Sequence, residues 1–196
     1  MNYLAHLYLA GDNSALVVGG FLGDFVKGPL KGEYPEQIEK GITLHRRIDS
    51  WSDQHPTVKQ IRQLLPDQFG RYSAIIADML CDHVLASEWD QFSDVSLPEF
   101  CQHRVGVLES NKSHFSNRAR QVLHRIKTDN WLTGYASLGY SLGALTGIGQ
   151  RLSRENPLHL LEQPISENYQ HLQKLCRQAL NDTAGNVAKW RVENEI

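Results

Sequence analysis

Apolar residues recur along most of the chain at the three- and four-residue spacing of α-helices. Within residues 72–92, the apolar positions 75, 76, 79, 80 and 84 would share one side of a helix. Within residues 166–189, the same spacing connects Leu172, Leu175, Cys176, Ala179 and Leu180. No stretch alternates apolar and polar residues as a strand would, and no turn sequence separates two strand-like runs. The pattern predicts an all-α protein.

Proline and capping residues indicate where several helices begin. Pro35 precedes the segment 36–54, which carries acidic residues in its first turn, as is favourable at a helix N-terminus. A second helix is expected to restart at Pro56, because a proline disfavours helical conformation in the residue before it. Further helices are expected over 96–110, with Ser96 as the N-cap, and over 114–129, with a basic polar face.

The size and composition of the chain suit one domain. It has 196 residues, of which 41% are hydrophobic and 21% are charged, as in ordinary globular proteins. The sequence contains no internal repeat, low-complexity segment or linker. We therefore expect a single-domain helical bundle over residues 1–196.

Charge and cysteine content bear on location and partners. A net charge of −2 argues against nonspecific nucleic-acid binding. Cys81, Cys101 and Cys176 are odd in number and lack metal-type spacing, which indicates reduced thiols. We read no signal peptide in the first residues, and no apolar run is long enough to span a bilayer. The expected location is the cytoplasm, with no nucleic-acid or membrane partner.

Acids and histidines recur at helical spacing in two of the expected helices. His45, Asp49 and Asp53 follow one another at four-residue intervals in the first. Asp78 and Asp82 repeat this interval in the second. Residues four apart share a helix face, and both segments are apolar enough to be buried. Several buried carboxylates cannot all stay ionised without a cation, so the pattern favours a metal-dependent hydrolase.

The same residues allow other interpretations. A buried ion-pair network would also explain the spacing, although few cations lie on the matching faces. Asp53 is compatible with a solvent-facing or capping role, and His55, directly before Pro56, with a helix terminus. Asp24 follows a glycine-rich stretch and could cap a helix, whereas His6 lies among leucines and could be an ordinary core histidine. Glycines 19, 20, 23 and 28 would let a ligand or another helix approach closely.

A competing motif occurs at residues 139–143, where GYSLG matches the nucleophile elbow of serine hydrolases with Ser141 as nucleophile. That motif needs a buried strand before it, which the helical pattern does not provide. The order of the remaining triad partners is also wrong, because His159 and His171 precede Asp182. The glycines at 139, 143 and 147 better suit close helix packing. The chain has no P-loop and no Glu-x-x-His pair typical of di-iron bundles.

Four blocks of sequence carry a family resemblance: MNYLAHLYLA, GGFLGDFVKG, LHRRIDSWSDQHP and ADMLCDHVLA. In this order they resemble the signature blocks of the acyl carrier protein phosphodiesterase family. The resemblance implies an all-helical fold like that of HD-type metal phosphohydrolases and a divalent cation, Mn²⁺ or Mg²⁺. It also implies removal of the 4′-phosphopantetheine arm from holo acyl carrier protein, giving the apo protein. The dipeptide Asp82-His83 reverses the HD order.

The chemistry of the residues suggests a role for each group. Oxygen and imidazole ligands without thiolates favour manganese, magnesium or iron over a structural zinc site, and such a metal neutralises phosphoryl charge and activates water. The expected metal ligands are Asp24, His45, Asp49, Asp78 and Asp82. The expected catalytic residues are His55, His83 and Asp78. The expected substrate-binding residues are His6, Lys27, Arg46 and Arg47.

Two alternatives to the carrier-protein substrate stay open. The same metal site could hydrolyse a nucleotide or another small phosphoester, because the chemistry at phosphorus would be the same. A non-enzymatic helical module could bind an acidic partner through basic residues. Two basic patches are candidates for holding any acidic partner: Lys27, Arg46, Arg47, Lys59 and Arg62, or Arg118, Arg120, Arg125 and Lys127.

Overall fold

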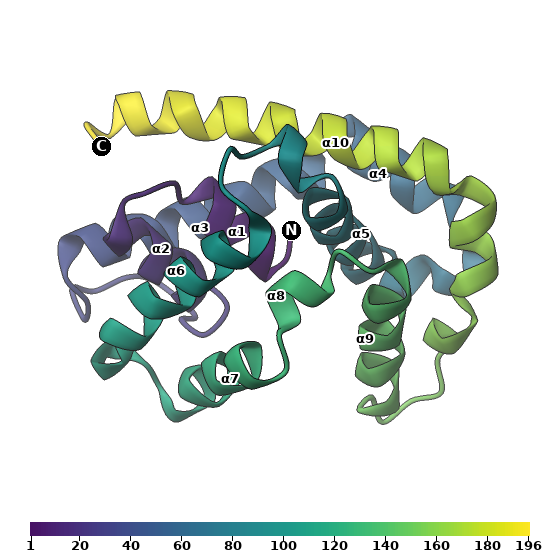
Figure 1. The fold of residues 1–196 in the computed structure, drawn as a ribbon, viewed down its shortest axis with the longest axis horizontal. Coiled ribbons are helices and arrows are strands. Elements are labelled where there is room, and N and C mark those ends of the chain that lie inside the picture. The colour runs from purple at the N-terminus through teal and green to yellow at the C-terminus, as the bar shows by residue number, and fades with distance from the viewer.

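The apolar faces of the helices meet in one core of 49 buried apolar residues. A computed structural model describes residues 1–196 and contains ten α-helices, four short 3₁₀ helices and no strand, which confirms the all-α fold (Figure 1). The α-helices are α1 (Tyr3–Leu9), α2 (Ser14–Leu22), α3 (Glu36–Gln54), α4 (Pro56–Leu64), α5 (Ser73–Ser87), α6 (Leu97–Ser110), α7 (Asn117–Thr128), α8 (Trp131–Gly134), α9 (Leu138–Gln150) and α10 (Glu162–Glu193). The 3₁₀ helices cover Asp67–Tyr72, Trp89–Gln91, Lys112–His114 and Leu158–Leu160.

The helices begin largely where the sequence predicts. α3 starts directly after Pro35 with two glutamates in its first turn, and α4 starts at Pro56. Ser96 caps α6 in a capping box, in which its side chain accepts from the Glu99 N–H while the Glu99 carboxylate accepts from the Ser96 N–H. α10 is longer than the expected 166–189. None of the helices combines the length and apolar composition that crossing a membrane requires.

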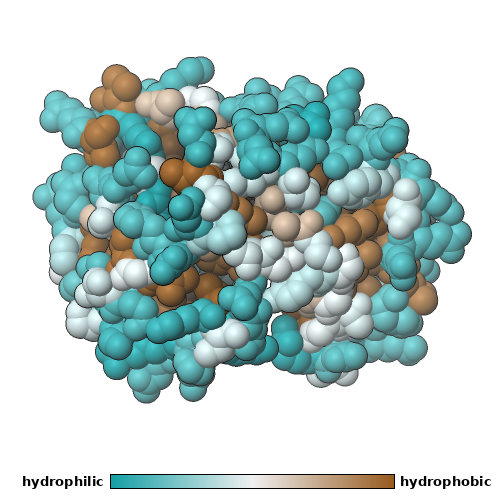
Figure 2. Space-filling model, viewed as in Figure 1, coloured by the Kyte–Doolittle hydropathy of each residue, from teal (hydrophilic) through white to brown (hydrophobic).

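The helices form a layer beneath the long α10, which runs along one edge of the molecule (Figure 1). α10 packs on α3, α4 and α5, and the short α1 lies against both α2 and α5. α7 and α9 lie on the side of the molecule away from α10, with α8 between them (Figure 1). The outer surface on this face is mostly hydrophilic, with apolar side chains exposed between the helices (Figure 2).

α2 and α3 cross at very short range because glycines lie at their contact. A Cβ atom on Gly19 would lie 2.4 Å from the Ile38 carbonyl oxygen, and one on Gly41 would lie 2.9 Å from the Ala15 carbonyl oxygen. The expectation of close approach is confirmed at Gly19, whereas a Cβ atom on Gly28 would meet nothing within 4 Å. The first glycines of the glycine-rich segment form the end of α2 rather than a turn, so that Asp24 directly follows the C-cap Gly23.

The glycines of α9 behave differently from the expectation. A Cβ atom on Gly143 would meet no atom within 4 Å, and one on Gly147 would meet only the Arg151 side chain, at 3.7 Å. The prediction of close helix packing at this stripe is therefore wrong, because no helix covers it. Ser141 lies inside α9 with its hydroxyl 3.5 Å from the Tyr135 carbonyl oxygen, so GYSLG forms no nucleophile elbow.

Candidate active site

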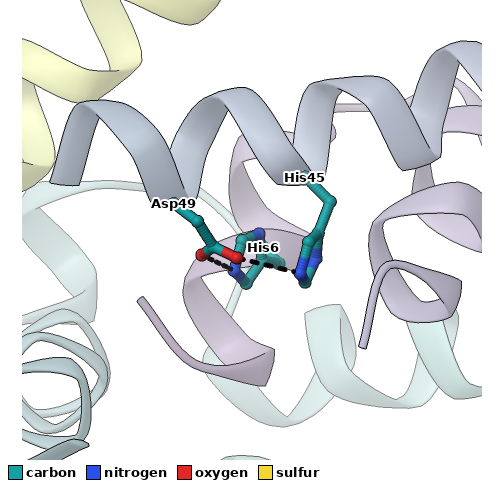
Figure 3. Close-up of side chains that lie close together, drawn as sticks. All are labelled: His6, His45 and Asp49. Carbon is teal, nitrogen blue, oxygen red and sulfur yellow. Dashed lines mark hydrogen bonds and ion pairs between the residues drawn. The ribbon is translucent and has the colours of Figure 1, made fainter. Parts of the chain in front are cut away.

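Three side chains from α1 and α3 converge at one point (Figure 3). The Asp49 carboxylate contacts both imidazoles, with one oxygen 3.1 Å from His6 Nε2 and the other 3.2 Å from His45 Nε2. The two rings are stacked, with their centroids 3.8 Å apart. The ligand atoms of the three residues all lie within 4.8 Å of one another. This group, His6, His45 and Asp49, is called the histidine–aspartate cluster below.

The local structure fixes the orientation of His45. Its Nδ1 lies 2.7 Å from the Gly20 carbonyl oxygen, which can only accept, so Nδ1 carries a proton. In the neutral ring, the lone pair of Nε2 then faces a carboxylate oxygen, an arrangement that requires either a second proton or a cation between them. Metal-binding histidines commonly donate their other N–H to a backbone carbonyl in this way. Gly23 leaves room for the ring, since a Cβ atom there would lie 2.1 Å from His45 Cγ.

His6 is held as a neutral imidazole. Its Nε2 lies 3.2 Å from the Met1 carbonyl oxygen, and its Nδ1 is buried without a hydrogen-bond partner. Burial, together with the nearby charge of His45, lowers the pKa of His6 to about 4. A buried nitrogen lone pair without a partner is unfavourable, and a cation is one group that would satisfy it.

Three carboxylates lie at or beside the cluster. Although burial raises its pKa, hydrogen bonds from His45 and His6 hold the pKa of Asp49 well below its usual value. Asp24 approaches the cluster, with one oxygen 3.9 Å from His45 Nε2. Asp78 lies 2.8 Å from the Met1 ammonium, which is also 3.8 Å from Asp49. The ammonium thus lies where two carboxylates attract a positive charge.

Asp82 does not join this group, although it lies one turn from Asp78. Its side chain is fully buried and accepts from the backbone N–H groups of Asn2, Leu4 and Ala5 at 3.1, 2.7 and 3.3 Å. Burial raises the pKa of Asp82 to about 7, against the effects of the Met1 ammonium and of these N–H groups. The expectation that Asp82 binds metal is corrected, because its oxygens cap the N-terminus of α1.

The two histidines expected to be catalytic also lie elsewhere. His83 Nδ1 donates to the Tyr135 carbonyl oxygen at 2.8 Å, and its Nε2 lies 2.6 Å from the Tyr169 hydroxyl, so both nitrogens are engaged. His55 caps α4 and contacts Asp182 of α10 at 3.2 Å. Both expectations are corrected, since each ring is held by partners away from the cluster.

The remaining predicted residues lie outside the cluster. Arg46 donates to the Val26 carbonyl oxygen at 3.0 Å, whereas Arg47 is exposed and Lys27 lines a small surface hollow beside Glu39. Asp53 pairs with Arg62, which agrees with its surface interpretation. The structure therefore groups His6, Asp24, His45, Asp49 and Asp78, and separates Asp82, His55, His83, Lys27, Arg46 and Arg47 from them.

A cleft that was not among the sequence-based expectations adjoins the cluster. It has a volume of about 860 Å³, and Asp24 and Asp78 line it together with Arg118, Arg125 and Arg151. Such a volume is typical of small-molecule sites. Arg118 and Arg125 had been assigned only to a basic surface patch. The uncovered glycines of α9 were the sequence signal for this cleft, since Gly143 and Gly147 lie in its wall.

The arrangement defines a class: an all-α protein with a His-His-Asp cluster able to bind a cation beside a cleft lined by arginines. The family model for acyl carrier protein phosphodiesterase matches residues 1–183. The chain belongs to the acyl carrier protein phosphodiesterase family.

Curated relatives agree with this assignment. An acyl carrier protein phosphodiesterase of Yersinia pestis is 36% identical over 176 residues, covering 89% of this chain and 91% of the relative. Proteins with the same name from Photorhabdus laumondii and Pectobacterium atrosepticum are 33% and 35% identical, covering 86% and 89% of this chain and 86% and 91% of the relatives. No solved structure matches. The resemblance seen in the four sequence blocks is confirmed.

Proposed function

We propose that the protein removes 4′-phosphopantetheine from holo acyl carrier protein by hydrolysing the phosphodiester bond. Family membership supports the substrate. The observation that carries the chemistry is the histidine–aspartate cluster at the end of a cleft that also holds three arginines. Hydrolysis of a phosphodiester needs cationic groups to stabilise the phosphoryl oxygens and a positioned water, and both can be supplied there.

We further propose that the cluster binds a divalent cation, Mn²⁺ or Mg²⁺, through His6, His45 and Asp49, with Asp24 as an additional ligand. Three observations support the fit: the Nε2 of His45 facing a carboxylate, the unpartnered His6 Nδ1, and the ammonium attracted to Asp49 and Asp78. The donor atoms are imidazole nitrogens and carboxylate oxygens, which suit these metals. When bound, the cation would supply charge neutralisation at phosphorus and lower the pKa of water.

Other residues of the chain would orient the histidines and the attacking water and would bind the phosphate. The Gly20 carbonyl holds His45 in one tautomer and orientation, and Asp49 holds both imidazoles together. Asp78 faces the cleft while it contacts the Met1 ammonium, so it is placed to orient the attacking water. Arg118 also lines the cleft and would bind the phosphate oxygens.

The test is incubation with holo acyl carrier protein and Mn²⁺, followed by intact-mass measurement of the carrier protein. His45→Asn should lose bound metal and reduce turnover by at least about a hundredfold, because it removes a ligand from the cluster. His171→Asn is the matched control, since His171 is an exposed histidine of α10. Equal metal content and turnover in wild type and His45→Asn would contradict the metal proposal.

The partner is proposed to be recognised partly through charge. Carrier proteins are acidic, and exposed arginines line the cleft next to the cluster. Attraction between exposed charges is screened by salt, so the KM for the carrier protein should rise with ionic strength. A KM independent of salt would contradict electrostatic recognition.

A small phosphoester is the second candidate substrate, because Trp131 lines the cleft and could stack on a nucleobase. Esters of AMP should therefore be tested in the same assay.

A further inference from the structure

The cleft beside the cluster is built from two walls of different chemistry. One wall consists of α7 and α8 and presents cationic and aromatic side chains. The other is α9, which presents the small residues Gly143, Ala144 and Gly147, with Tyr140 before them and Ile148 after them. Figure 1 shows α7 and α9 as separate helices with α8 between them. A ligand in the cleft would therefore lie between charged side chains and a helix that is bare only in its middle turn.

The aromatic residues of the cleft lie in two close pairs. The ring centroids of Tyr3 and Trp131 are 6.4 Å apart, and those of Tyr135 and Tyr140 are 6.2 Å apart. The Asp24 carboxylate, 3.9 Å from His45 Nε2, marks the end of the cleft at the cluster. Arg118 lies near that end, since its charge and that of Asp24 both act on the Tyr3 phenol, whose pKa is raised chiefly by burial.

A second cation lies beside an aromatic ring of the cleft. The Arg125 guanidinium lies 5.1 Å from the centroid of the Trp131 ring, and its charge also reaches the Tyr140 phenol, whose pKa is raised chiefly by burial. Arg118 and Arg125 are two turns apart on α7 and line the cleft together. Cations, phenols and apolar rings are therefore all available to one ligand.

The bare face of α9 is open along the same path. An added Cβ atom would meet nothing within 4 Å at Gly143, and only the mobile end of Arg151 at Gly147. Larger side chains at these positions would fill the cleft without clashing with the protein. Since the fold does not need glycine at either position for packing, the missing side chains leave space for a ligand.

We infer, resting on the proposed function, that the cleft binds the 4′-phosphopantetheine arm in extended form along the Gly143–Gly147 face of α9, with Arg118 on its phosphate. The arm is a chain with an anionic phosphate at one end, two amides in its middle and a thiol at the other end. The cleft offers groups of the matching kinds: guanidinium groups for the phosphate, phenol hydroxyls that can pair with amides, and aromatic and apolar surface. A short stretch of helix without large side chains, between Tyr140 and Ile148, suits a narrow chain better than a folded protein segment.

Binding of the free arm tests this inference without turnover. By titration calorimetry, 4′-phosphopantetheine should bind wild type, and Gly147→Leu should weaken that binding by about tenfold or more, because the leucine would occupy the cleft. Gly139→Leu is the matched control, as Gly139 lies on the same helix but outside this cleft. It should bind as wild type. Thermal unfolding checks that both variants fold. We expect that they do, because leucine favours helix more than glycine does.

A second comparison tests the orientation of the arm. Arg118→Gln should weaken binding of 4′-phosphopantetheine by about ten- to a hundredfold and should change the affinity for pantetheine, which lacks the phosphate, much less. Equal losses for both ligands would place the phosphate elsewhere and overturn the orientation. Unchanged binding in Gly147→Leu, or AMP binding more tightly than the arm, would overturn the inference.

These experiments distinguish failure of the inference about the cleft from failure of the proposed hydrolysis. If wild type binds the free arm and Gly147→Leu does not, but the arm is never released from the carrier protein, the inference stands and the proposed hydrolysis fails. If the arm is released equally fast by wild type and Gly147→Leu, the hydrolysis stands and the inference fails.

Discussion

Glycines at helical spacing occur in two regions of the molecule and have opposite uses. In α2, Gly19 brings the backbone of α3 into contact, and Gly23 makes room for the His45 ring. In α9, Gly143 and Gly147 face open space in the wall of the cleft. The first region packs tightly beside the cluster, whereas the second leaves the wall of the neighbouring cleft open.

The difference teaches what glycine spacing does and does not predict. It predicts a helix face without side chains, because only glycine lacks Cβ. It does not predict what lies against that face, since that depends on segments distant in sequence. In α2 the neighbours are a second helix and a histidine, and in α9 the cleft remains. Four predictions follow, from the largest expected effect to the smallest.

The closed region should be intolerant of a single methyl group at its crossing. Gly19→Ala should lower the free energy of unfolding by about 3 kcal/mol, because the added Cβ would overlap the backbone of α3 and force the helices apart. Urea unfolding measures this loss. Gly20→Ala, on the same helix with its nearest neighbour at 3.6 Å, is the control and should change stability little. Similar stabilities for the two variants would remove the contrast between α2 and α9.

A methyl group at the end of the same helix should act on the cluster. Gly23→Ala should displace the His45 ring and reduce turnover of holo acyl carrier protein about a hundredfold, since small misplacements of reacting groups cost about this much. Bound metal, measured by elemental analysis, should fall with it. Full activity in Gly23→Ala would mean that the position of His45 is not required. Gly20→Ala again serves as control.

The buried carboxylate behind α1 should make stability depend on pH. The pKa of Asp82 is raised to about 7 in the folded protein, from 3.8, so the folded state binds the proton more tightly. Its contribution is therefore present near pH 4 and is lost as the pH rises through 7. Wild type should therefore lose about 2 kcal/mol of unfolding free energy relative to Asp82→Asn between about pH 5 and pH 7, as measured with urea in metal-free protein. A constant difference would show that Asp82 has the same pKa folded and unfolded.

The open region should accept the same methyl group with a small gain. Gly143→Ala should raise the free energy of unfolding by about 0.5–1 kcal/mol, because alanine favours helix and nothing obstructs its Cβ. Thermal unfolding against wild type measures it. A loss of stability would mean that α9 is covered at this position and would remove the distinction between the two regions.

The fold was largely readable from the sequence, because helix signals are local. Pro35, Pro56 and the Ser96 capping box lie within a few residues of the helix ends that they determine. The pairing of His45 with Asp49 was readable for the same reason, since both lie one turn apart on α3.

The rest of the site depends on contacts between distant segments. The spacing of Asp78 and Asp82 placed both on one face of α5, but nearly every position from Ile76 to Ala86 is buried, so the spacing could not indicate which neighbour each would meet. α1 covers Asp82, and α8 and α10 supply the partners of His83. The cleft is formed by α7, α8 and α9 meeting residues at the start of the chain, which no local pattern encodes.

The cap that Asp82 provides for α1 also bears on how the site assembles. α1 has seven residues, too few to persist as an isolated helix in water, and the carboxylate that completes its N-terminus lies 78 residues from Leu4. His6, carried by α1, can therefore take its place only after α5 has formed and docked. Contacts of such long sequence separation form slowly. The histidine–aspartate cluster should be among the last parts of the chain to become ordered on refolding, and recovery of activity should lag behind recovery of helical circular dichroism.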